Sequence, residues 1–407
     1  MHFKKLPLAI ALGAAAVAPL AHAQSSVTVY GKLYPYIEEE SGSSPSPVGT
    51  PVSTLASPAT GVKGVPTIKG MSAGNSRIGF RGTEDMGGGL KAIFQLESVV
   101  SVDNGTAGSS TAFWNRDTFV GLVNEKFGTV RLGLMDTVFK EYGDTLGILG
   151  ISSGTPLSSS NVLRKVGFGT NSASRFHERR ANSIRYDSPK FGGFEAGLQV
   201  ATQENLSATP SAGAAKTYSM GVKWEGGPFY AALAYEQHDN WFGGSFNTAT
   251  SSMRNTGAAN NGVTSKDKAV QATVEWRFAK GQAIEFDVIR KSYDEGAVVN
   301  GRFKNYDNTA WLIGYDGRFG LFRVAAHYVK SGAGSCERLN AACTTTGLEG
   351  SQITAGVSYS LSKRTYVFGA VSQVNNGAAA RFAATDFGTA SPGEDSRHLM
   401  AGISHSF

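Results

Sequence analysis

Positively charged side chains recur in this sequence at positions that would share one face of an extended chain. Arg77 and Arg81, for example, are an even number of residues apart. A guanidinium group stays charged at any pH of interest, so a cluster of them would attract and orient anions rather than exchange protons. The candidate residues are the cations Arg77, Arg81, Lys91, Arg116, Arg131, Arg179, Arg180 and Arg185 and the carboxylates Glu141 and Asp144. Taken singly, each of them could equally be an ordinary solvated charge.

Catalysis has little support in the residue pattern. A nucleophile needs a base and an orienting group within reach of it, but the histidines are scattered along the chain and two of the seven lie near its start. The zinc-protease motif H-E-x-x-H does not occur. We therefore expect no enzymatic activity, no cofactor and no metal.

Residues 75–98 show the local pattern that would position these charges. Apolar and polar residues alternate on both sides of a glycine-rich turn at residues 85–89, which is the period of a strand and not of a helix. In a soluble sandwich, the polar face would lie in water. In a membrane barrel, the same alternation puts apolar side chains against lipid and charges in an aqueous lumen. The rest of the chain decides between these two interpretations.

The N-terminus has the features of a secretory signal peptide. Lys4 and Lys5 precede an uncharged apolar run and an A-x-A cleavage pattern at residues 21–23. We predict cleavage after Ala23, which makes residues 24–407 the mature domain. No other stretch approaches the ~18 apolar residues that a spanning helix needs. The net charge of +6 is spread along the chain, without the basic block typical of a nucleic-acid partner.

Short and long connections alternate along the whole chain, which predicts fifteen connections between sixteen strands. A soluble sandwich has no reason to place every long loop at one end, whereas outer-membrane barrels have an even number of antiparallel strands, short periplasmic turns and long external loops. The predicted fold class is therefore all-β, a 16-stranded antiparallel transmembrane β-barrel wide enough for an aqueous channel. The strands are predicted at residues 26–39, 75–84, 90–98, 112–124, 129–138, 179–188, 192–202, 216–225, 229–238, 268–278, 282–292, 308–316, 321–330, 352–361, 365–374 and 397–407.

The connection at residues 139–178 is the predicted constriction loop. Unstructured loops of this length in compact folds are usually functional, and the mildly apolar residues 146–151 suit a loop folded into a barrel better than one in water. Such a loop could bring its carboxylates close to the arginines of the wall. Alternation would let only one of Arg179 and Arg180 point inward. A mobile external loop is the alternative.

The C-terminal residues and the two cysteines complete the predicted architecture. The last residues alternate as a strand that ends on Phe407, and in a barrel this strand must pair with the first one so that no edge is left open. Cys336 and Cys343 lie seven residues apart, and after secretion we expect a disulfide between them. A metal site there is a weaker alternative because no pair of histidines lies nearby.

Several segments together resemble the Gram-negative general porins of the neisserial and β-proteobacterial type. These segments are VTVYGKLY, SRIGFRGTEDMGGGLKAIFQLES, FVGLVNEKFGTVRLG, NSIRYDSPKFGGFEAG and the final AGISHSF. The resemblance implies a homotrimer in the outer membrane, surrounded by lipid and lipopolysaccharide, with its third external loop folded into the lumen. It also implies that the barrel-assembly machinery reads Phe407. The proline-rich first loop, at residues 41–74, departs from the family pattern.

The expected function is passive diffusion of small hydrophilic solutes and ions. Rings of arginine or lysine at a narrow point favour anions, so we expect an anion preference. A substrate-specific channel for a sugar, phosphate or organic anion is the nearest alternative, and it would show aromatic tracks or a denser basic ladder. An adhesin or a structural barrel is a third possibility that would not require an inward loop.

Overall fold

A computed structural model of the 407-residue chain describes most of the predicted barrel. The described residues are 26–51, 53–55, 59–106, 112–143, 145–150, 154–169, 176–202, 215–241, 264–296, 300–383 and 389–407. The predicted signal peptide and Asp144 lie outside these residues. Neither helix within them has the length and apolar character needed to cross a bilayer.

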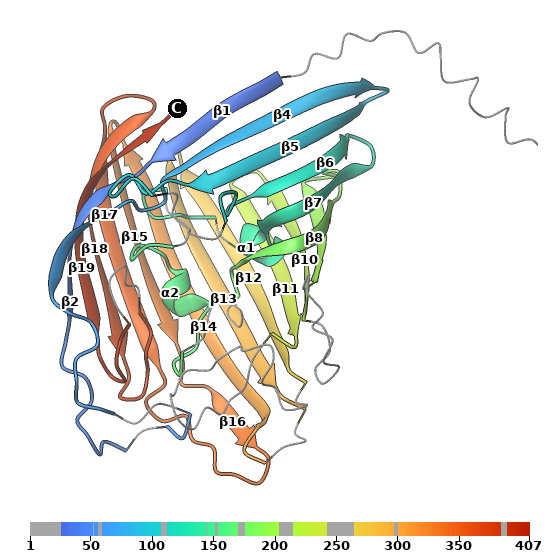
Figure 1. The fold of residues 1–407 in the computed structure, drawn as a ribbon. Helices are drawn as coiled ribbons and strands as arrows, with labels where there is room; N and C mark the ends of the chain where they lie inside the picture. The colour runs from blue at the N-terminus through green and yellow to red at the C-terminus, as the bar shows by residue number, and fades with distance from the viewer. Residues whose placement is uncertain are drawn as a thin grey trace, which may run out of the picture.

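The chain forms one closed antiparallel sheet, a barrel of sixteen strands (Figure 1). The first strand comprises β1 (Ser26–Leu33) and β2 (Tyr36–Gly42), and the second comprises β3 (Ile68–Ser72) and β4 (Arg77–Gly87). The other fourteen are β5 (Leu90–Val99), β6 (Thr118–Asn124), β7 (Gly128–Asp136), β8 (Arg179–Asp187), β9 (Phe194–Thr202), β10 (Lys216–Gly226), β11 (Phe229–Asp239), β12 (Lys266–Ala279), β13 (Gln282–Asp294), β14 (Phe303–Phe319), β15 (Phe322–Ser331), β17 (Gly350–Ser360), β18 (Thr365–Asn376) and β19 (Ser396–Ser406). The predicted fold class is confirmed.

Pro35 interrupts the first barrel strand. Proline has no N–H to donate to a ladder, and the adjacent Tyr34 N donates instead to the side chain of Ser76 over 2.8 Å. β1 therefore pairs mainly with β4, while β2 pairs with β3 and β19. The expected unbroken strand at residues 26–39 is wrong at this point. The strand expected at residues 112–124 begins only at Thr118.

The barrel closes where the last strand meets the first. Phe407 and Gly31 exchange two backbone hydrogen bonds of 3.1 Å each, next to the two β1–β19 residue pairs. A Cβ atom on Gly31 would lie 2.3 Å from the Phe407 ring, so only glycine allows this close approach. The predicted pairing of the two end strands is thus present, and it leaves no open edge.

Alternation along the strands gives the barrel an apolar outer face and a polar inner face. Val27, Leu132 and Ile184 are among the many large hydrophobic side chains exposed on the outside. Polar side chains such as Gln199 and Thr273 are buried on the inside. This reversal of the soluble pattern is the arrangement expected of a barrel whose outer face contacts lipid.

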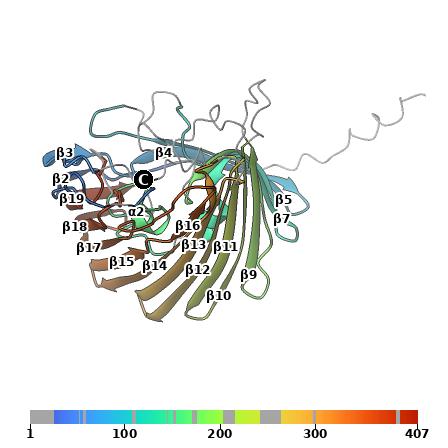
Figure 2. The same ribbon diagram turned by 90° about the horizontal axis from the view of Figure 1, so that it is seen from below.

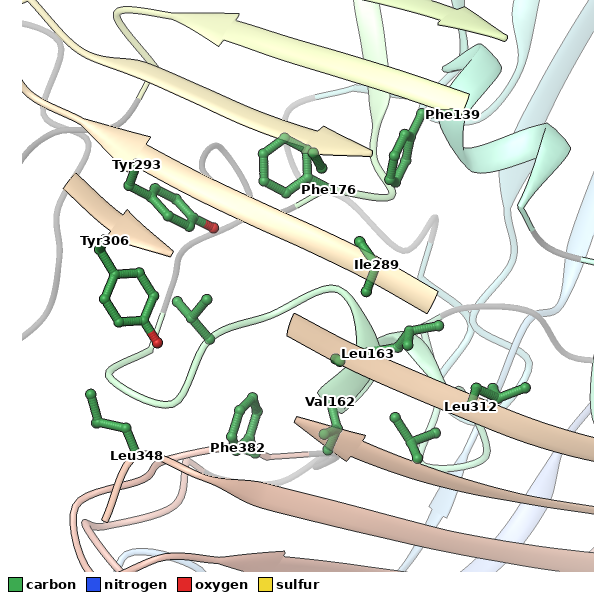
Figure 3. Close-up of a cluster of buried hydrophobic side chains, with 14 of the residues drawn as sticks. Phe139, Val162, Leu163, Phe176, Ile289, Tyr293, Tyr306, Leu312, Leu348 and Phe382 are labelled. Carbon is green, nitrogen blue, oxygen red and sulfur yellow. The ribbon is translucent and has the colours of Figure 1, made fainter. Parts of the chain in front are cut away.

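The connection between β7 and β8, which we call loop three, fills part of the barrel interior (Figure 2). Its two helices are α1 (Val138–Tyr142) and α2 (Ser160–Leu163). Its apolar side chains pack against inward-facing residues of the wall, as Figure 3 shows for Val162 and Leu163 near Leu312. Ile148 and Leu149 belong to a second cluster, which includes Phe368 of β18. The apolar residues that predicted an inward loop are therefore its contacts with the wall.

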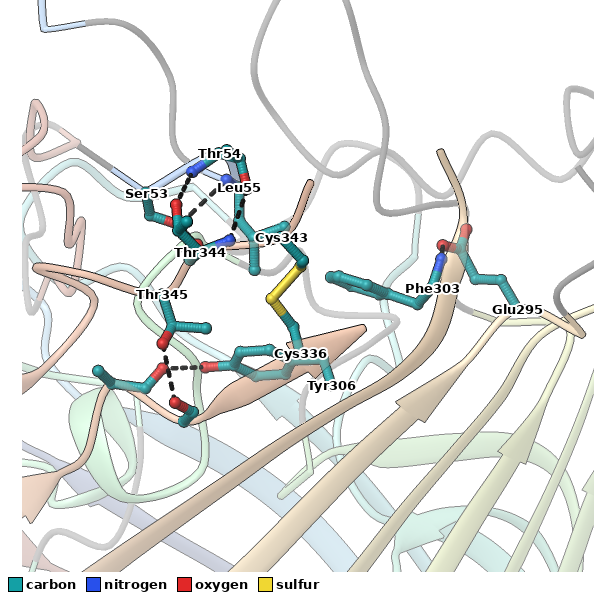
Figure 4. The surroundings of a disulfide bond; sticks show 12 residues. Ser53, Thr54, Leu55, Glu295, Phe303, Tyr306, Cys336, Cys343, Thr344 and Thr345 are labelled. Atoms are coloured by element: carbon teal, nitrogen blue, oxygen red, sulfur yellow. Dashed lines mark hydrogen bonds between the residues drawn. A yellow bond between two sulfur atoms is a disulfide. The ribbon is translucent and has the colours of Figure 1, made fainter. Parts of the chain in front are cut away.

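The first external loop docks on the loop that carries the disulfide (Figure 4). A disulfide joins Cys343 to Cys336, which lies in β16 (Ser335–Arg338), a short strand that pairs with β14. Thr54 and Thr344 exchange hydrogen bonds of 2.9 and 3.0 Å between the two loops. These contacts give the proline-rich first loop a defined place over the external end of the barrel.

Replacing both cysteines with serine should loosen this docking without unfolding the barrel. The two cysteines are only seven residues apart in the sequence. By constraining so short a loop in the unfolded chain, the disulfide adds less than about 3 kcal/mol to the free energy of unfolding. The backbone hydrogen bonds of the barrel wall do not depend on it. We expect faster protease cleavage within residues 41–74 and an unchanged heat-resistant barrel on gels. Reduced wild-type protein is the control. Loss of the folded barrel in the double variant would contradict this expectation.

Candidate pore constriction

Loop three leaves and rejoins the wall at a single point. Thr137 N donates to Glu178 O over 3.3 Å, which ties the two ends of the loop together. The hydroxyl of Thr137 accepts from Lys140 N and caps α1. Phe139 N donates over 2.9 Å to the hydroxyl of Ser219 on the inner face of β10. These bonds direct the first turn of the loop into the barrel.

Arg185 of β8 holds this first turn of the loop on the barrel wall through an ion pair. Its guanidinium is only 1% exposed and forms ion pairs with Glu141 of α1, over 2.6 Å, and with Asp187, over 2.7 Å. Arg131 on the neighbouring strand pairs with the same Asp187 over 2.6 Å. Two arginines therefore meet two carboxylates, and the group has no net charge. Arg185 holds the loop and is not an open binding site for an anion.

The middle of loop three is held through its backbone carbonyls. Arg323 of β15 donates to the carbonyl oxygen of Gly147 over 3.2 Å. Tyr366 of β18 donates to the carbonyl oxygen of Leu149 over 2.7 Å. Lys32 of β1 donates to the carbonyl oxygen of Gly150 over 3.0 Å. Just before this segment, Leu146 N donates to the carboxylate of Glu285 on β13 over 2.7 Å. The loop is thus fixed to strands on several sides of the lumen.

The second half of loop three rests on a buried amine. Lys291 of β13 donates to the carbonyl oxygens of Leu163 and Lys165 over 2.7 and 2.6 Å, just after α2. Arg164 is also buried and donates to the side chain of Gln271 over 3.1 Å. Burying a charged side chain is unfavourable unless it is well hydrogen-bonded, and here the carbonyls of the loop serve that role.

Four cations lie on one side of the lumen, and only two of them pair with a carboxylate among the described residues. Arg77 and Arg116 both pair with Glu97, over 3.4 and 2.5 Å. Arg81 and Lys32 lie over aromatic rings and have no ion-pair partner within the described part of the chain. Lys32 is directly opposite Arg77 in the β1–β4 register. We call Lys32, Arg77, Arg81 and Arg116 the basic wall.

The remaining predicted cations have other positions. Lys91 is on the inner face of β5, opposite Asp85 of β4 and next to the short turn between these two strands. Arg179 pairs with Asp117 and Asp136, over 2.7 and 2.8 Å. Arg180 is buried, and its guanidinium lies 3.2 Å from the Nε2 atom of a histidine on β11. The expectation that only one of this pair points inward is wrong, because Arg179 lines a cavity with Lys140 of loop three while Arg180 contacts the buried histidine.

Sequence reasoning missed Lys32 and Arg323 as pore residues. Lys32 is the one charged residue of β1, and Arg323 shares β15 only with Lys330, seven residues away and therefore on the opposite face. The alternation of Tyr30 and Lys32 on one face could have drawn attention to Lys32. Its importance became evident only from its position opposite Arg77.

An open volume of about 450 Å³ lies on the short-turn side of loop three. Acidic and basic side chains mix along its wall, where Arg323 pairs with Asp316 over 2.6 Å and Lys223 with Glu195 over 2.8 Å. Near neighbours of opposite sign largely cancel at a distance, so the net field of this vestibule is weaker than that of the basic wall. Its lining residues are Glu141, Thr145, Leu146, Lys223, Glu225, Tyr230, Glu275, Arg277, Asp316, Arg318 and Arg323.

The fold and the loop inside it define a class, the outer-membrane β-barrels whose lumen is narrowed by one of their own loops. A sequence profile described as "Gram-negative porin" matches residues 9–379. The chain belongs to the Gram-negative porin family, and this membership places it in the outer membrane.

Curated relatives match over part of their length. The "Major outer membrane protein P.IB" of Neisseria lactamica is 34% identical over 165 residues, which are 40% of this chain and 43% of that protein. The protein of the same name from Neisseria meningitidis serogroup A is 32% identical over 239 residues, or 58% and 61% of the two chains. This chain therefore matches about half the length of these relatives.

Solved structures match over almost the whole chain. An "Anion-selective porin from Comamonas acidovorans" has a TM-score of 0.66 and 23% sequence identity, with 94% of this chain and 100% of that chain covered. OmpT of Vibrio cholerae, described as an outer membrane protein in its trimer form, has a TM-score of 0.59 and 12% identity, with 94% and 99% covered. At these identities, the likeness shows the fold.

Proposed function

We propose that this protein is a channel through which small hydrophilic solutes and ions diffuse passively, with a preference for anions. The observation that carries the proposal is the basic wall beside loop three, where two of the four cations pair with one carboxylate and the other two have no ion-pair partner among the described residues. A fixed excess of positive charge at a narrow, partly dehydrated point raises the local concentration of anions. The similarity to a porin described as anion-selective supports the same conclusion.

Purified protein in a planar lipid bilayer should form open channels with an ohmic conductance. In a KCl gradient, the reversal potential should have the sign of chloride preference, and the preference should weaken as the salt concentration rises. Failure to conduct would reject the channel proposal, whereas cation preference would reject only the assignment of selectivity to the basic wall.

A substrate-specific channel is the nearest alternative, and a saturating conductance for phosphate or for an organic anion would favour it. An adhesin or structural barrel is less well supported, because neither requires a loop held inside the lumen.

We do not propose an enzymatic role. Residues 70–74 match the spacing G-x-S-x-G, but Ser72 lies on strand β3, and its hydroxyl accepts from Gly74 N. A nucleophile elbow instead needs a sharp turn into a helix.

The proposed assembly is a homotrimer embedded in outer-membrane lipid and lipopolysaccharide. Family membership and the trimer form described for the Vibrio cholerae protein support it. Unheated protein in mild detergent should have a mass that is a multiple of three chains. A strictly monomeric species would contradict the trimer and leave the channel proposal intact.

We also propose that the barrel-assembly machinery reads Phe407, which ends the closing strand.

A further inference from the structure

Three buried side chains with metal-binding chemistry meet where the first and last barrel strands pair. His398 of β19 lies directly opposite Glu40 of β2, and Glu38 follows on the same inner face. All three residues are at most 3% exposed. One donor atom from each lies within 4.8 Å of the donor atoms of the other two. No sequence motif indicates this group, because His398 and Glu38 are 360 residues apart.

We propose that Glu38, Glu40 and His398 bind one divalent transition-metal ion, with Zn²⁺ as the representative probe. Zn²⁺ accepts one imidazole nitrogen together with carboxylate oxygens, and three protein ligands leave a coordination position open. A donor set with an imidazole favours such an ion over Ca²⁺ or Mg²⁺, which prefer oxygen alone.

The two ring nitrogens of His398 face different partners, as a ligand histidine requires. Nδ1 lies 2.6 Å from the Glu38 carboxylate, on the side where the ion would bind. Nε2 lies 3.4 Å from the Ser396 hydroxyl. Metal-binding histidines generally donate their second N–H to such an outer partner, which sets the tautomer and the ring orientation. Ser396 is therefore the expected positioning residue.

The charge of the group also suits a dication. Two carboxylates lie close together out of water, and a neutral imidazole joins them when it acts as a ligand. A divalent cation is attracted to two carboxylates that lie this close together.

A metal at this position would join the two ends of the barrel. β1 and β19 share only two residue pairs in their ladder, whereas β2 and β19 share seven. Cross-linking Glu38 and Glu40 to His398 would strengthen this seam. An ion that binds only the folded state raises the folded-to-unfolded ratio about 100-fold at ~100 times its Kd.

The test is Zn²⁺ binding to the full mature chain, without a histidine tag, in detergent after removal of metals with EDTA. Equilibrium dialysis and elemental analysis should find one Zn²⁺ per chain, with a higher temperature of heat denaturation. X-ray absorption at the zinc edge should show one imidazole among oxygen donors. Absence of stoichiometric Zn²⁺ in the wild type, or more than one imidazole per zinc, would overturn the proposal irrespective of any variant.

Variants locate the site. His398→Gln and Glu40→Gln should lower Zn²⁺ affinity at least tenfold, and Ser396→Ala should lower it by about tenfold. Glu39→Gln is the matched control, because Glu39 is the exposed neighbour on the same strand and pairs with Lys69 over 2.9 Å. Equal losses in Glu39→Gln and Glu40→Gln would mean surface binding only. The proposal is independent of pore selectivity, which we expect to be unchanged in the folded variants.

Discussion

Replacing Arg185 with Met should detach the first turn of loop three and destabilise the barrel by about 3–5 kcal/mol, the usual effect of removing one partner of a buried ion pair. Arg185 is almost completely buried and holds both Glu141 and Asp187. Its loss leaves Asp187 paired with Arg131 alone and leaves Glu141 with no ion-pair partner among the described residues. We expect a lower temperature of heat denaturation and a larger, noisier single-channel conductance, because the loop that narrows the lumen is released at its base.

Two further variants separate the stability effect from the effect on the loop. Glu141→Gln leaves the Arg185–Asp187 pair intact, so its conductance should change more than its denaturation temperature. Arg290→Gln is the control for arginine loss, because Arg290 is 70% exposed, faces outward and makes only a 3.5 Å pair with Asp307. Surface pairs of this kind contribute about 0–1 kcal/mol. Wild-type stability and conductance in the Arg185 variant would show that the anchor is dispensable.

The double variant Lys32→Gln, Arg81→Gln should move the channel strongly toward cations. These two members of the basic wall have no ion-pair partner among the described residues. A unit charge at ~4 Å contributes about 1 kcal/mol in water, which is about a fivefold change in local anion concentration for each charge. The reversal potential in a KCl gradient measures the shift. The shift should be larger near 0.1 M than near 1 M salt, because the screening length falls from about 10 Å to about 3 Å.

Two controls test whether the lost charge is the cause of the expected shift in ion selectivity. Tyr366→Phe removes a neighbouring hydrogen bond to loop three, at the carbonyl of Leu149, without changing any charge. It should leave selectivity unchanged. Arg131→Gln removes a cation that Asp187 already compensates over 2.6 Å, so its shift should be smaller than that of the double variant. An equal or larger shift in Arg131→Gln would place the selective point near β7 and β8 and not at the basic wall.

The architecture could be predicted in detail because its causes are local. A strand of a membrane barrel must alternate between lipid and water, so residues 75–98 already show which side chains face outward. Short turns and long loops alternate because antiparallel strands return to the same two ends. The apolar residues 146–151 indicated a loop that packs inside, and Ile148 and Leu149 do pack on the wall. The strand boundaries missed most clearly are those at Pro35 and at residues 112–117.

The roles of individual charges were not predictable from the sequence. Arg77, Arg81, Arg131 and Arg185 look equivalent along the chain, because all fall on polar faces of strands. The structure separates them. Glu141 and Asp187 neutralise Arg131 and Arg185, whereas Arg77 shares Glu97 with Arg116 and Arg81 has no ion-pair partner among the described residues. Strict alternation likewise predicted opposite directions for Arg179 and Arg180, whereas both contact groups of the barrel interior.

The sequence by itself determined that this chain forms a sixteen-stranded barrel with an apolar exterior, a polar interior and a third loop suited to the lumen. Only the tertiary structure decided which cations remain uncompensated, how the first loop docks on the disulfide loop, and which side chains meet at the barrel seam. The physical reason is the distance along the sequence over which each interaction acts. Alternation and turn formation depend on neighbours a few residues apart, whereas ion pairs depend on register between strands, and Lys32 reaches its place beside Gly150 only after the whole barrel has closed.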